Sequence, residues 1–247
     1  IDKNITSKKF IKRLVGAKEF LSNIERWCLW IKDKDVNEAL SIPDIRHRVD
    51  MVRNMRMSSP DKSAHKLANR PHQFREINET TTNSIIVPLA TSGRRDYIPI
   101  GFLSNEFVVT NLASVIYDSE PWLLSLLSSL MHMVWIKTVA GRLRDGYRYS
   151  PVIVYNTFPF PTINETQKEE LNQHVFNILG EREKHSEKTL AQLYDPDKMP
   201  DGLREAHHQN DLAIERCYRS KPFESDEERL EYLFKLYEKM IAKEEAK

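Results

Sequence analysis

The stretch PWLLSLLSSLMHMVWIKTVA, residues 121–140, is the longest apolar run of this 247-residue sequence. Serines and His132 interrupt it, and it falls short of the ~20 predominantly apolar residues that a membrane span requires. We therefore expect a buried central helix and no contact with a membrane. Asp118 or Ser119 is placed to cap this helix, and Pro121 suits its first turn, where a missing N–H costs nothing.

The next stretch, AGRLRDGYRYSPVIVYNTFPFP (residues 140–161), joins that helix to a β-branched run at 151–155, which we expect to be a strand. Gly146 is expected to let the backbone turn sharply between them. Arginine can donate two hydrogen bonds to guanine, aspartate can accept one from cytosine, and tyrosine can stack or wedge. The turn residues with this chemistry are Arg142, Arg144, Asp145, Tyr147, Arg148 and Tyr149. Spacing alone allows a second interpretation, a surface cluster of salt bridges.

The front of the chain is basic. Residues 1–75 hold 17 Lys and Arg against 9 Asp and Glu, whereas residues 165–247 hold 14 against 20. The segment 43–57 predicts a helix with Ile45, Val49 and Val52 along one stripe and arginines on its other faces. Cations of this kind can grip the phosphates of nucleic acid without reading sequence. The residues expected to contact a DNA backbone are Lys8, Lys9, Lys12, Arg13, Arg46, Arg53, Arg142 and Tyr149.

The pattern of short strands followed by helices predicts an α+β fold. Residues 1–160 are expected to form a domain with a small, mostly antiparallel sheet, and residues 161–247 a small all-α domain. The polar segment 58–83 is expected to be a loop or hinge. Ser225 and Glu228 form a capping box before the last helix. The expected strands are 25–33, 84–90, 97–103, 106–110 and 114–117, and the expected helices of the second domain are 165–179, 201–218 and 225–243.

No pattern in the sequence predicts bond-breaking chemistry or a metal site. The seven glycines never form G-x-G, the usual cradle of a dinucleotide or of S-adenosylmethionine. His207 and His208 are adjacent on a predicted helix and point apart, whereas metal ligands on a helix prefer i, i+4 spacing. His132, on the apolar helix, is expected to be a core histidine, because no carboxylate or nucleophile lies near it in the sequence.

The two cysteines, Cys28 and Cys217, lie far apart in the sequence and predict neither a zinc site nor a disulfide framework. We therefore expect a reducing compartment, the cytoplasm. The sequence shows no signal peptide and does not begin with methionine, so we expect a piece of a longer protein.

Several motifs, in order along the chain, resemble one family. SLLSSLMHMVWIKTVAGRLRDGYRYSPVIVYNTFPFP is similar to the end of the target-recognition domain of the MmeI-like DNA methyltransferases and type II restriction-modification enzymes. KKFIKRLVGAKEFLSNIERWCLWIKD and RRDYIPIGFLSNEFVVTN also resemble that domain, and LYDPDKMPDGLREAHHQNDLAIERCY resembles the helical C-terminal domain of the family. The resemblance covers residues 8–220.

The resemblance implies a DNA-reading module of a larger enzyme, with the methyltransferase domain N-terminal to it as its partner. That parent would transfer a methyl group from S-adenosylmethionine to adenine N6, and some members add a nuclease that uses Mg²⁺. No catalytic residue, cofactor or metal ligand is expected within this chain. A non-catalytic protein–protein docking module is the alternative, and a steep loss of affinity with salt would favour DNA.

The resemblance also implies which side chains read bases. They fall on the arginine turn and on two upstream segments: Arg144, Asp145, Gly146 and Arg148; Asn111 and Leu112; Ser92, Gly93, Arg94 and Arg95. Asp145 belongs to this set by its chemistry rather than by the resemblance. Many members carry an acidic residue and an arginine where this chain has Arg144 and Gly146, so the resemblance implies the role of the turn but not the base pair that it prefers.

Overall fold

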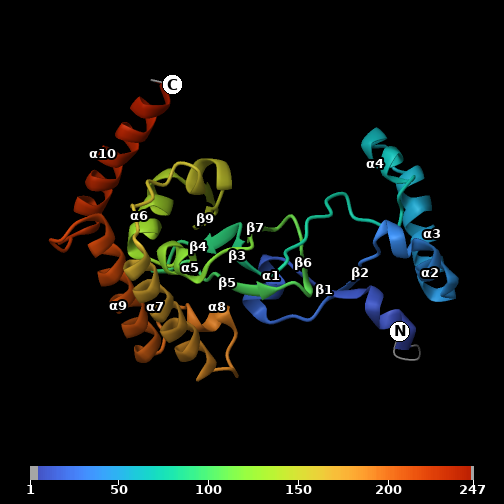
Figure 1. The fold of residues 1–247 in the computed structure, drawn as a ribbon, viewed down its shortest axis with the longest axis horizontal. Helices are drawn as coiled ribbons and strands as arrows, with labels where there is room; N and C mark the ends of the chain where they lie inside the picture. The colour runs from blue at the N-terminus through green and yellow to red at the C-terminus, as the bar shows by residue number, and fades with distance from the viewer. Residues whose placement is uncertain (1–4, 246–247) are drawn as a thin grey trace.

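The apolar run forms two helices rather than one in the computed structural model, which describes residues 5–245 (Figure 1). Helix α5 (Pro121–Leu127) and helix α6 (Leu130–Val139) meet at an angle of 55°. The break falls at Ser129, whose backbone is extended and whose side chain caps α6 by accepting a hydrogen bond from His132 N. Glu120, not Asp118 or Ser119, is the N-cap residue of α5.

Helices α5 and α6 lie in the largest hydrophobic core of the described chain. Most of their side chains are buried, and His132 is among them, as expected. Within residues 5–245 no single helix is long and apolar enough to span a membrane, and only this bent pair passes such a test by length and composition. The burial of both helices against the sheets and the C-terminal helices accounts for their apolar composition.

The α+β prediction is confirmed, with three small, mostly antiparallel sheets where the sequence predicted one. Each has three strands, and the pairing is antiparallel except between β1 and β6. The first sheet has the order β2 (Trp27–Leu29), β1 (Ile11–Val15), β6 (Phe107–Val109). The second has the order β5 (Gly101–Ser104), β3 (Asn83–Pro88), β7 (Ala113–Tyr117). The third has the order β4 (Ala90–Ser92), β9 (Gly146–Arg148), β8 (Gly141–Leu143).

The expected strand at 151–155 is wrong. Pro151–Tyr155 is a short π-helix, η3, in which Asn156 N donates to Pro151 O at 2.9 Å. The β-branched composition favours a strand, but no neighbouring strand pairs with this segment in the described chain. The expected strands 25–33 and 97–103 are also shorter than predicted, since only Trp27–Leu29 and Gly101–Ser104 pair.

The basic front forms a separate lobe, seen at the right of Figure 1. The helix predicted at 43–57 is confirmed as α3 (Pro43–Met57), with Ile45 and Val49 buried. The segment expected to be a loop, 58–83, contains the short helix α4 (Lys62–Leu67). The other helical elements of this lobe and of the adjoining β1–β2 segment are η1 (Ile5–Phe10), α1 (Ala17–Ser22), η2 (Asp33–Asp35) and α2 (Val36–Ser41).

The C-terminal part is helical, as predicted, and is called the helical module here (residues 163–245). The prediction for 201–218 is confirmed as α9, and Glu228 N donates to Ser225 Oγ at the start of α10. Helix α7 packs against α5, so both parts of the chain share one core. The proposed domain boundary near residue 161 stays a prediction. The helices are α7 (Glu165–Glu183), α8 (Leu190–Leu193), α9 (Asp201–Tyr218) and α10 (Asp226–Glu245).

Candidate nucleic-acid interface

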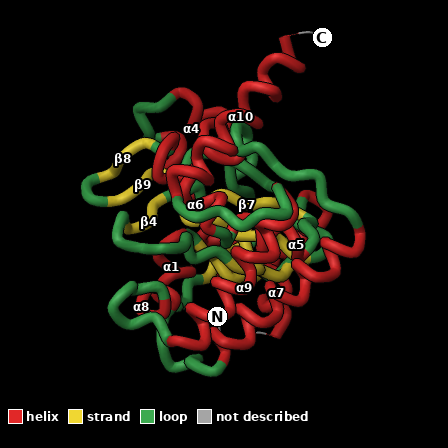
Figure 2. The backbone as a smooth tube through the Cα atoms, turned by 90° about the vertical axis from the view of Figure 1, so that its left-hand side faces the viewer, coloured by secondary structure: helices red, strands yellow, loops and turns green. Residues whose placement is uncertain are grey.

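The three segments expected to read bases lie side by side, joined by backbone hydrogen bonds. Strand β4 pairs with β9, which places Ser92 opposite Gly146 and extends to a hydrogen bond of 3.1 Å from Gly93 N to Asp145 O. The β8–β9 hairpin stands out at the left-hand edge of Figure 2, beside β4. The turn at 92–95 and the arginine turn therefore form one surface.

The third segment joins this surface through Leu89. Leu89 N donates to Leu112 O at 3.4 Å, and Tyr149 N donates to Leu89 O at 2.9 Å. Asn111 and Leu112 are exposed next to these bonds. The structure thus brings together three segments that are spread over residues 89–148 of the sequence. We call this the readout surface: residues 89–95, 111–112 and 141–148.

Arg144 and Asp145 form the two-residue turn of the β8–β9 hairpin. Arg144 has a φ of 53°, the left-handed region that residues other than glycine rarely adopt. This conformation is typical of a tight hairpin turn, and it presents Arg144 at the exposed tip. The expectation that Gly146 makes the turn is wrong, because Gly146 lies within β9.

Gly146 and Gly93 are instead required for close approach. A Cβ atom on Gly146 would lie 2.3 Å from Thr91 O, and one on Gly93 would lie 2.2 Å from Asp145 O. Both distances are far inside van der Waals contact, and both partners are backbone atoms. Larger residues at these positions would push β4 away from the hairpin.

Side chains of the third sheet alternate between a buried and an open face. Thr91 and Tyr147 are paired in register and buried, and the Arg142 guanidinium lies over the Tyr147 ring at 4.3 Å on the same face. The opposite face carries Arg148, which stands between Gly141 and Ala90 in the register. Because both of its cross-strand neighbours are small, the Arg148 side chain is exposed and uncrowded.

The four arginines of the predicted readout set differ in their partners. Arg144 and Arg148 have no hydrogen-bond or ion-pair partner among residues 5–245 and are exposed. Arg94 instead donates to Asp197 Oδ2 at 2.5 Å, and Arg95 is partly buried beside Thr91 Oγ1. Burial also lowers the pKa of Arg95. Arg144 and Arg148 are therefore the two arginines best placed to bind a partner.

The prediction that Tyr149 contacts the DNA backbone is wrong. Tyr149 is only 3% exposed, and its hydroxyl lies 3.3 Å from His132 Nε2 inside the core. Burial raises the pKa of Tyr149 well above its usual range. The reason is its position in the strand alternation, two residues after the buried Tyr147, so its side chain serves packing.

The expected phosphate-binding cations of the basic front lie on the surface, but most already have acidic partners. Lys9 forms an ion pair with Glu38, and Arg13 forms a longer one with Glu25 at 3.5 Å. Lys8 is exposed. Exposed pairs of this kind contribute at most about 1 kcal/mol, so a phosphate can replace the carboxylate at small cost. The remaining cations of this set are Lys12 beside Glu79, Arg53 beside Asp50, and Arg46, which donates to Leu40 O.

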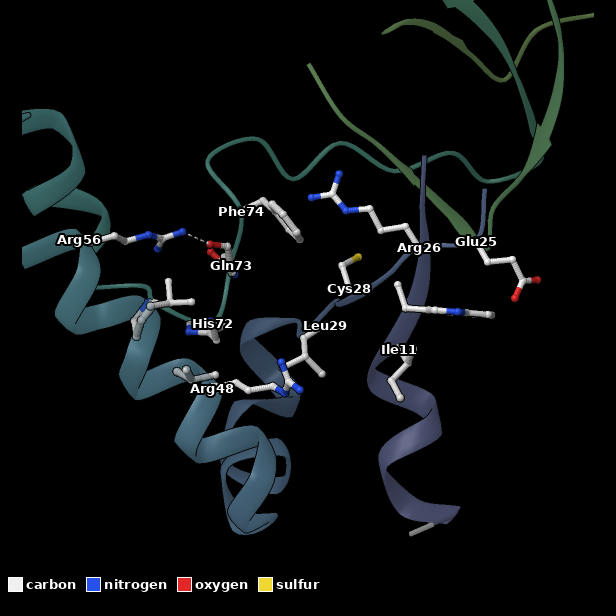
Figure 3. Close-up of a pocket in the computed structure, with 14 residues that line it drawn as sticks. Ile11, Glu25, Arg26, Cys28, Leu29, Arg48, Arg56, His72, Gln73 and Phe74 are labelled. Atoms are coloured by element: carbon white, nitrogen blue, oxygen red, sulfur yellow. Dashed lines mark hydrogen bonds between the residues drawn. The ribbon is translucent and has the colours of Figure 1, made fainter. Parts of the chain in front are cut away.

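A pocket of about 540 Å³ lies between the β1–β2 strands, helix α3 and the segment 71–74 (Figure 3). Figure 3 shows Arg26 on one wall and Arg48 and Arg56 on the other. Arg56 donates to backbone carbonyls, among them Gln73 O at 2.7 Å, and so ties α3 to this wall. Burial raises the pKa of Cys28 to about 11, so its thiol is protonated and a poor nucleophile at neutral pH. No pattern in the sequence predicts this pocket.

Two of the three histidines considered in the sequence, His132 and His207, are buried. Burial lowers the pKa of His132 to about 4, which keeps its ring neutral in the core. His207 is also fully buried, stacks on Tyr97 with ring centroids 4.1 Å apart and contacts Tyr194 Oη at 2.7 Å, whereas His208 is exposed. Among residues 5–245 no group of His, Cys, Asp and Glu is arranged to hold a metal ion.

The helical module holds the segment that follows the 92–95 turn. Asp211 of α9 accepts a hydrogen bond from Tyr97 Oη at 2.6 Å, and Arg182 of α7 donates to Ile100 O at 2.7 Å. Two surface ion pairs, Arg94 with Asp197 and Asp96 with Arg204, add to these contacts. The module therefore fixes the position of one edge of the readout surface.

The fold and the site together define a target-recognition module: an α+β domain that exposes unpaired arginines on a fixed hairpin and is braced by a helical module. Residues 1–162 match the family model described as the MmeI target recognition domain, and residues 163–244 match that of the MmeI C-terminal domain. The chain belongs to the MmeI family.

Two relatives are longer proteins than this chain. It is 45% identical over 231 residues to DNA methyltransferase A of Bacillus subtilis (strain 168), a match that covers 94% of this chain and 26% of that protein. It is similar to the solved structure of the type IIL restriction-modification enzyme MmeI in complex with DNA, with a TM-score of 0.91 and 36% identity over 98% of this chain and 32% of that one. The chain thus spans about a quarter to a third of these relatives.

Proposed function

We propose that this chain is the sequence-specific, double-stranded DNA recognition module of a larger DNA methyltransferase. The observation that carries the proposal is the readout surface, where three separate segments meet and Arg144 and Arg148 have no partner in the described chain. The family membership and the similarity to a DNA complex of MmeI support the same assignment.

The geometry suits the major groove of DNA, which admits a two-stranded β-ribbon. Arg148 stands on the open face of the third sheet and Arg144 at the hairpin tip, where each can donate two hydrogen bonds to guanine. Asp145, exposed at the same turn, can accept a hydrogen bond from cytosine. The basic lobe would contact phosphates and fix the register without reading bases.

The larger protein would transfer a methyl group from S-adenosylmethionine to adenine N6, and the bound cofactor would supply that methyl group. A nuclease domain with Mg²⁺ would add cleavage in members that have one. These activities belong to parts outside this chain, and the residues described here would bind and orient the duplex in the cytoplasm. The similarity to a methyltransferase over a quarter of its length supports this division.

The first test measures binding of labelled duplex DNA by this chain over a range of salt concentrations. We expect weak binding. The logarithm of the binding constant should fall linearly and steeply with the logarithm of the salt concentration, because contacts to several phosphates release counterions from the DNA. No binding at low salt would contradict the proposal and favour the protein–protein docking module. Methyl transfer by the chain alone would contradict the division of labour.

The second test maps methylated sites across a genome for the full-length protein that contains this chain. The variant Arg144→Glu is expected to change which bases flank the methylated adenine, whereas Lys9→Ala is expected to lower methylation evenly over all sites. If the Arg144→Glu map matched that of the native protein at every position, the arginine turn would not read bases.

A further inference from the structure

Leu143 lies on the readout surface but is not among the residues expected to read bases. It ends strand β8, next to the Arg144 turn, and is 50% exposed. Its partner in the register is Gly146, which has no side chain to cover it, and Ser92 follows across β9. Leu143 belongs to none of the hydrophobic clusters of the described chain.

The alternation of the sheet settles which way Leu143 faces. Arg142 and Tyr147 share the buried face, so Leu143 shares the open face with Arg148. A leucine on this face adds nothing to the core. Its neighbours on the same face, Gly141, Gly146 and Ala90, have small side chains or none, so packing does not require a large aliphatic residue at position 143. Leu112, 58% exposed, is a second aliphatic side chain on the readout surface.

We propose that Leu143 is a specificity-determining residue that contacts the C5-methyl group of a thymine in the major groove. The inference rests on the proposed function. The thymine methyl is the one apolar group that the base pairs display in that groove, and an aliphatic side chain is its natural contact. Arg148 and Leu143 would then read different chemical groups from the same open face.

The register also indicates where that thymine lies. Arg148 of β9 is opposite Gly141 of β8. Leu143 lies two residues beyond Gly141 on β8, which makes it a diagonal neighbour of Arg148. Such neighbours are about 7–8 Å apart, and successive bases on one DNA strand are about 3.4 Å apart along the axis. The thymine is therefore expected about two base-pair steps from the base pair that Arg148 reads.

The test replaces each thymine of the mapped recognition site, one at a time, with uracil, which lacks only the C5-methyl group. Affinity for each duplex is measured with the full-length native protein and with Leu143→Ala, Leu143→Met and the control Ile241→Ala, an exposed aliphatic residue of α10. We expect one position at which uracil weakens native binding about fourfold, the effect of one buried methyl group. Leu143→Met and Ile241→Ala should retain this sensitivity, and Leu143→Ala should lose it.

Two other results have different meanings. If every thymine-to-uracil exchange affected the native protein and Leu143→Ala equally, the role of Leu143 would be refuted while DNA recognition stood. If the native protein bound duplexes without sequence preference, the proposed function itself would fail, and the inference with it. A thermal melt of Leu143→Ala, which removes no buried side chain, would exclude misfolding as the cause of its lost sensitivity to uracil.

Discussion

Asp211 joins the helical module to the segment behind the readout surface, and its charge is predicted to set how stability depends on pH. The side chain is 3% exposed, accepts hydrogen bonds from Tyr97 Oη at 2.6 Å and Leu130 N at 2.7 Å, and has no ion-pair partner in the described chain. Burial is the main cause that raises the pKa of Asp211 from 3.8 to about 7. Replacement by asparagine keeps the shape and removes the titration.

The sign follows from which state binds the proton more tightly. Between pH 4 and pH 7 the folded protein holds a proton on Asp211 that the unfolded chain has released, so the free energy of unfolding falls as pH rises through this range. At about 1.4 kcal/mol for each unit of pKa shift, Asp211 costs the native protein about 2–3 kcal/mol between pH 5 and pH 8. The variant Asp211→Asn should not show this loss.

The assay is urea unfolding of the native chain and of Asp211→Asn at pH 5, 6, 7 and 8, followed by tryptophan fluorescence. The stability of Asp211→Asn relative to the native chain should rise by about 2–3 kcal/mol from pH 5 to pH 8. The control is Asp197→Asn, which changes a carboxylate of the same module whose side chain is 68% exposed. If the free energies of unfolding of the native chain and of Asp211→Asn changed in parallel from pH 5 to pH 8, Asp211 would not titrate in the folded state and the reasoning would be refuted.

Three further predictions concern the readout surface. Arg148→Ala should reduce discrimination at one base pair by about 1–3 kcal/mol, measured as the ratio of affinities for cognate and substituted duplexes; an unchanged ratio would show that Arg148 reads no base. Gly146→Ala should lower the melting temperature and weaken sequence discrimination, because its Cβ atom would lie 2.3 Å from a backbone carbonyl of β4; a native melting temperature would contradict the close approach. Arg94→Ala should change stability by less than about 1 kcal/mol in urea unfolding, since its ion pair with Asp197 is exposed.

Local sequence signals predicted the helices best. The helix predicted at 43–57 is confirmed because Ile45 and Val49 lie on one stripe and Pro43 stands at its start, and the helix predicted at 201–218 is confirmed with the same bounds. The apolar run at 121–140 carried no such signal for its break, since Ser129 acts as a cap only because the chain bends there. At 151–155 the β-branched residues favoured a strand, and the tertiary context supplied no partner for one.

The sequence indicated the three segments of the candidate site but not the contacts that join them. The resemblance indicated three segments, yet nothing local predicts that β4 pairs with β9 or that Leu89 bonds to both neighbours, because these contacts join residues distant in sequence. Tyr149 could have been assigned to the core from the alternation with Tyr147, had residues 146–149 been read as a strand. No local pattern singles out Leu143, because one leucine between two arginines does not show which face of a strand it occupies.

The structure separates the residues that hold the readout surface from those that can vary on it. Thr91 and Tyr147 are buried and the glycines at 93 and 146 admit no Cβ atom, so changes at these positions would move the strands themselves. Arg144, Arg148 and Leu143 point away from that packing, and each can change without loss of a buried contact. The helical module serves the same arrangement, because Asp197 accepts a hydrogen bond from Arg94 and Asp211 accepts one from Tyr97, which holds the 94–97 segment. A new specificity would therefore be reached most directly through the three outward side chains, with the bracing contacts left intact.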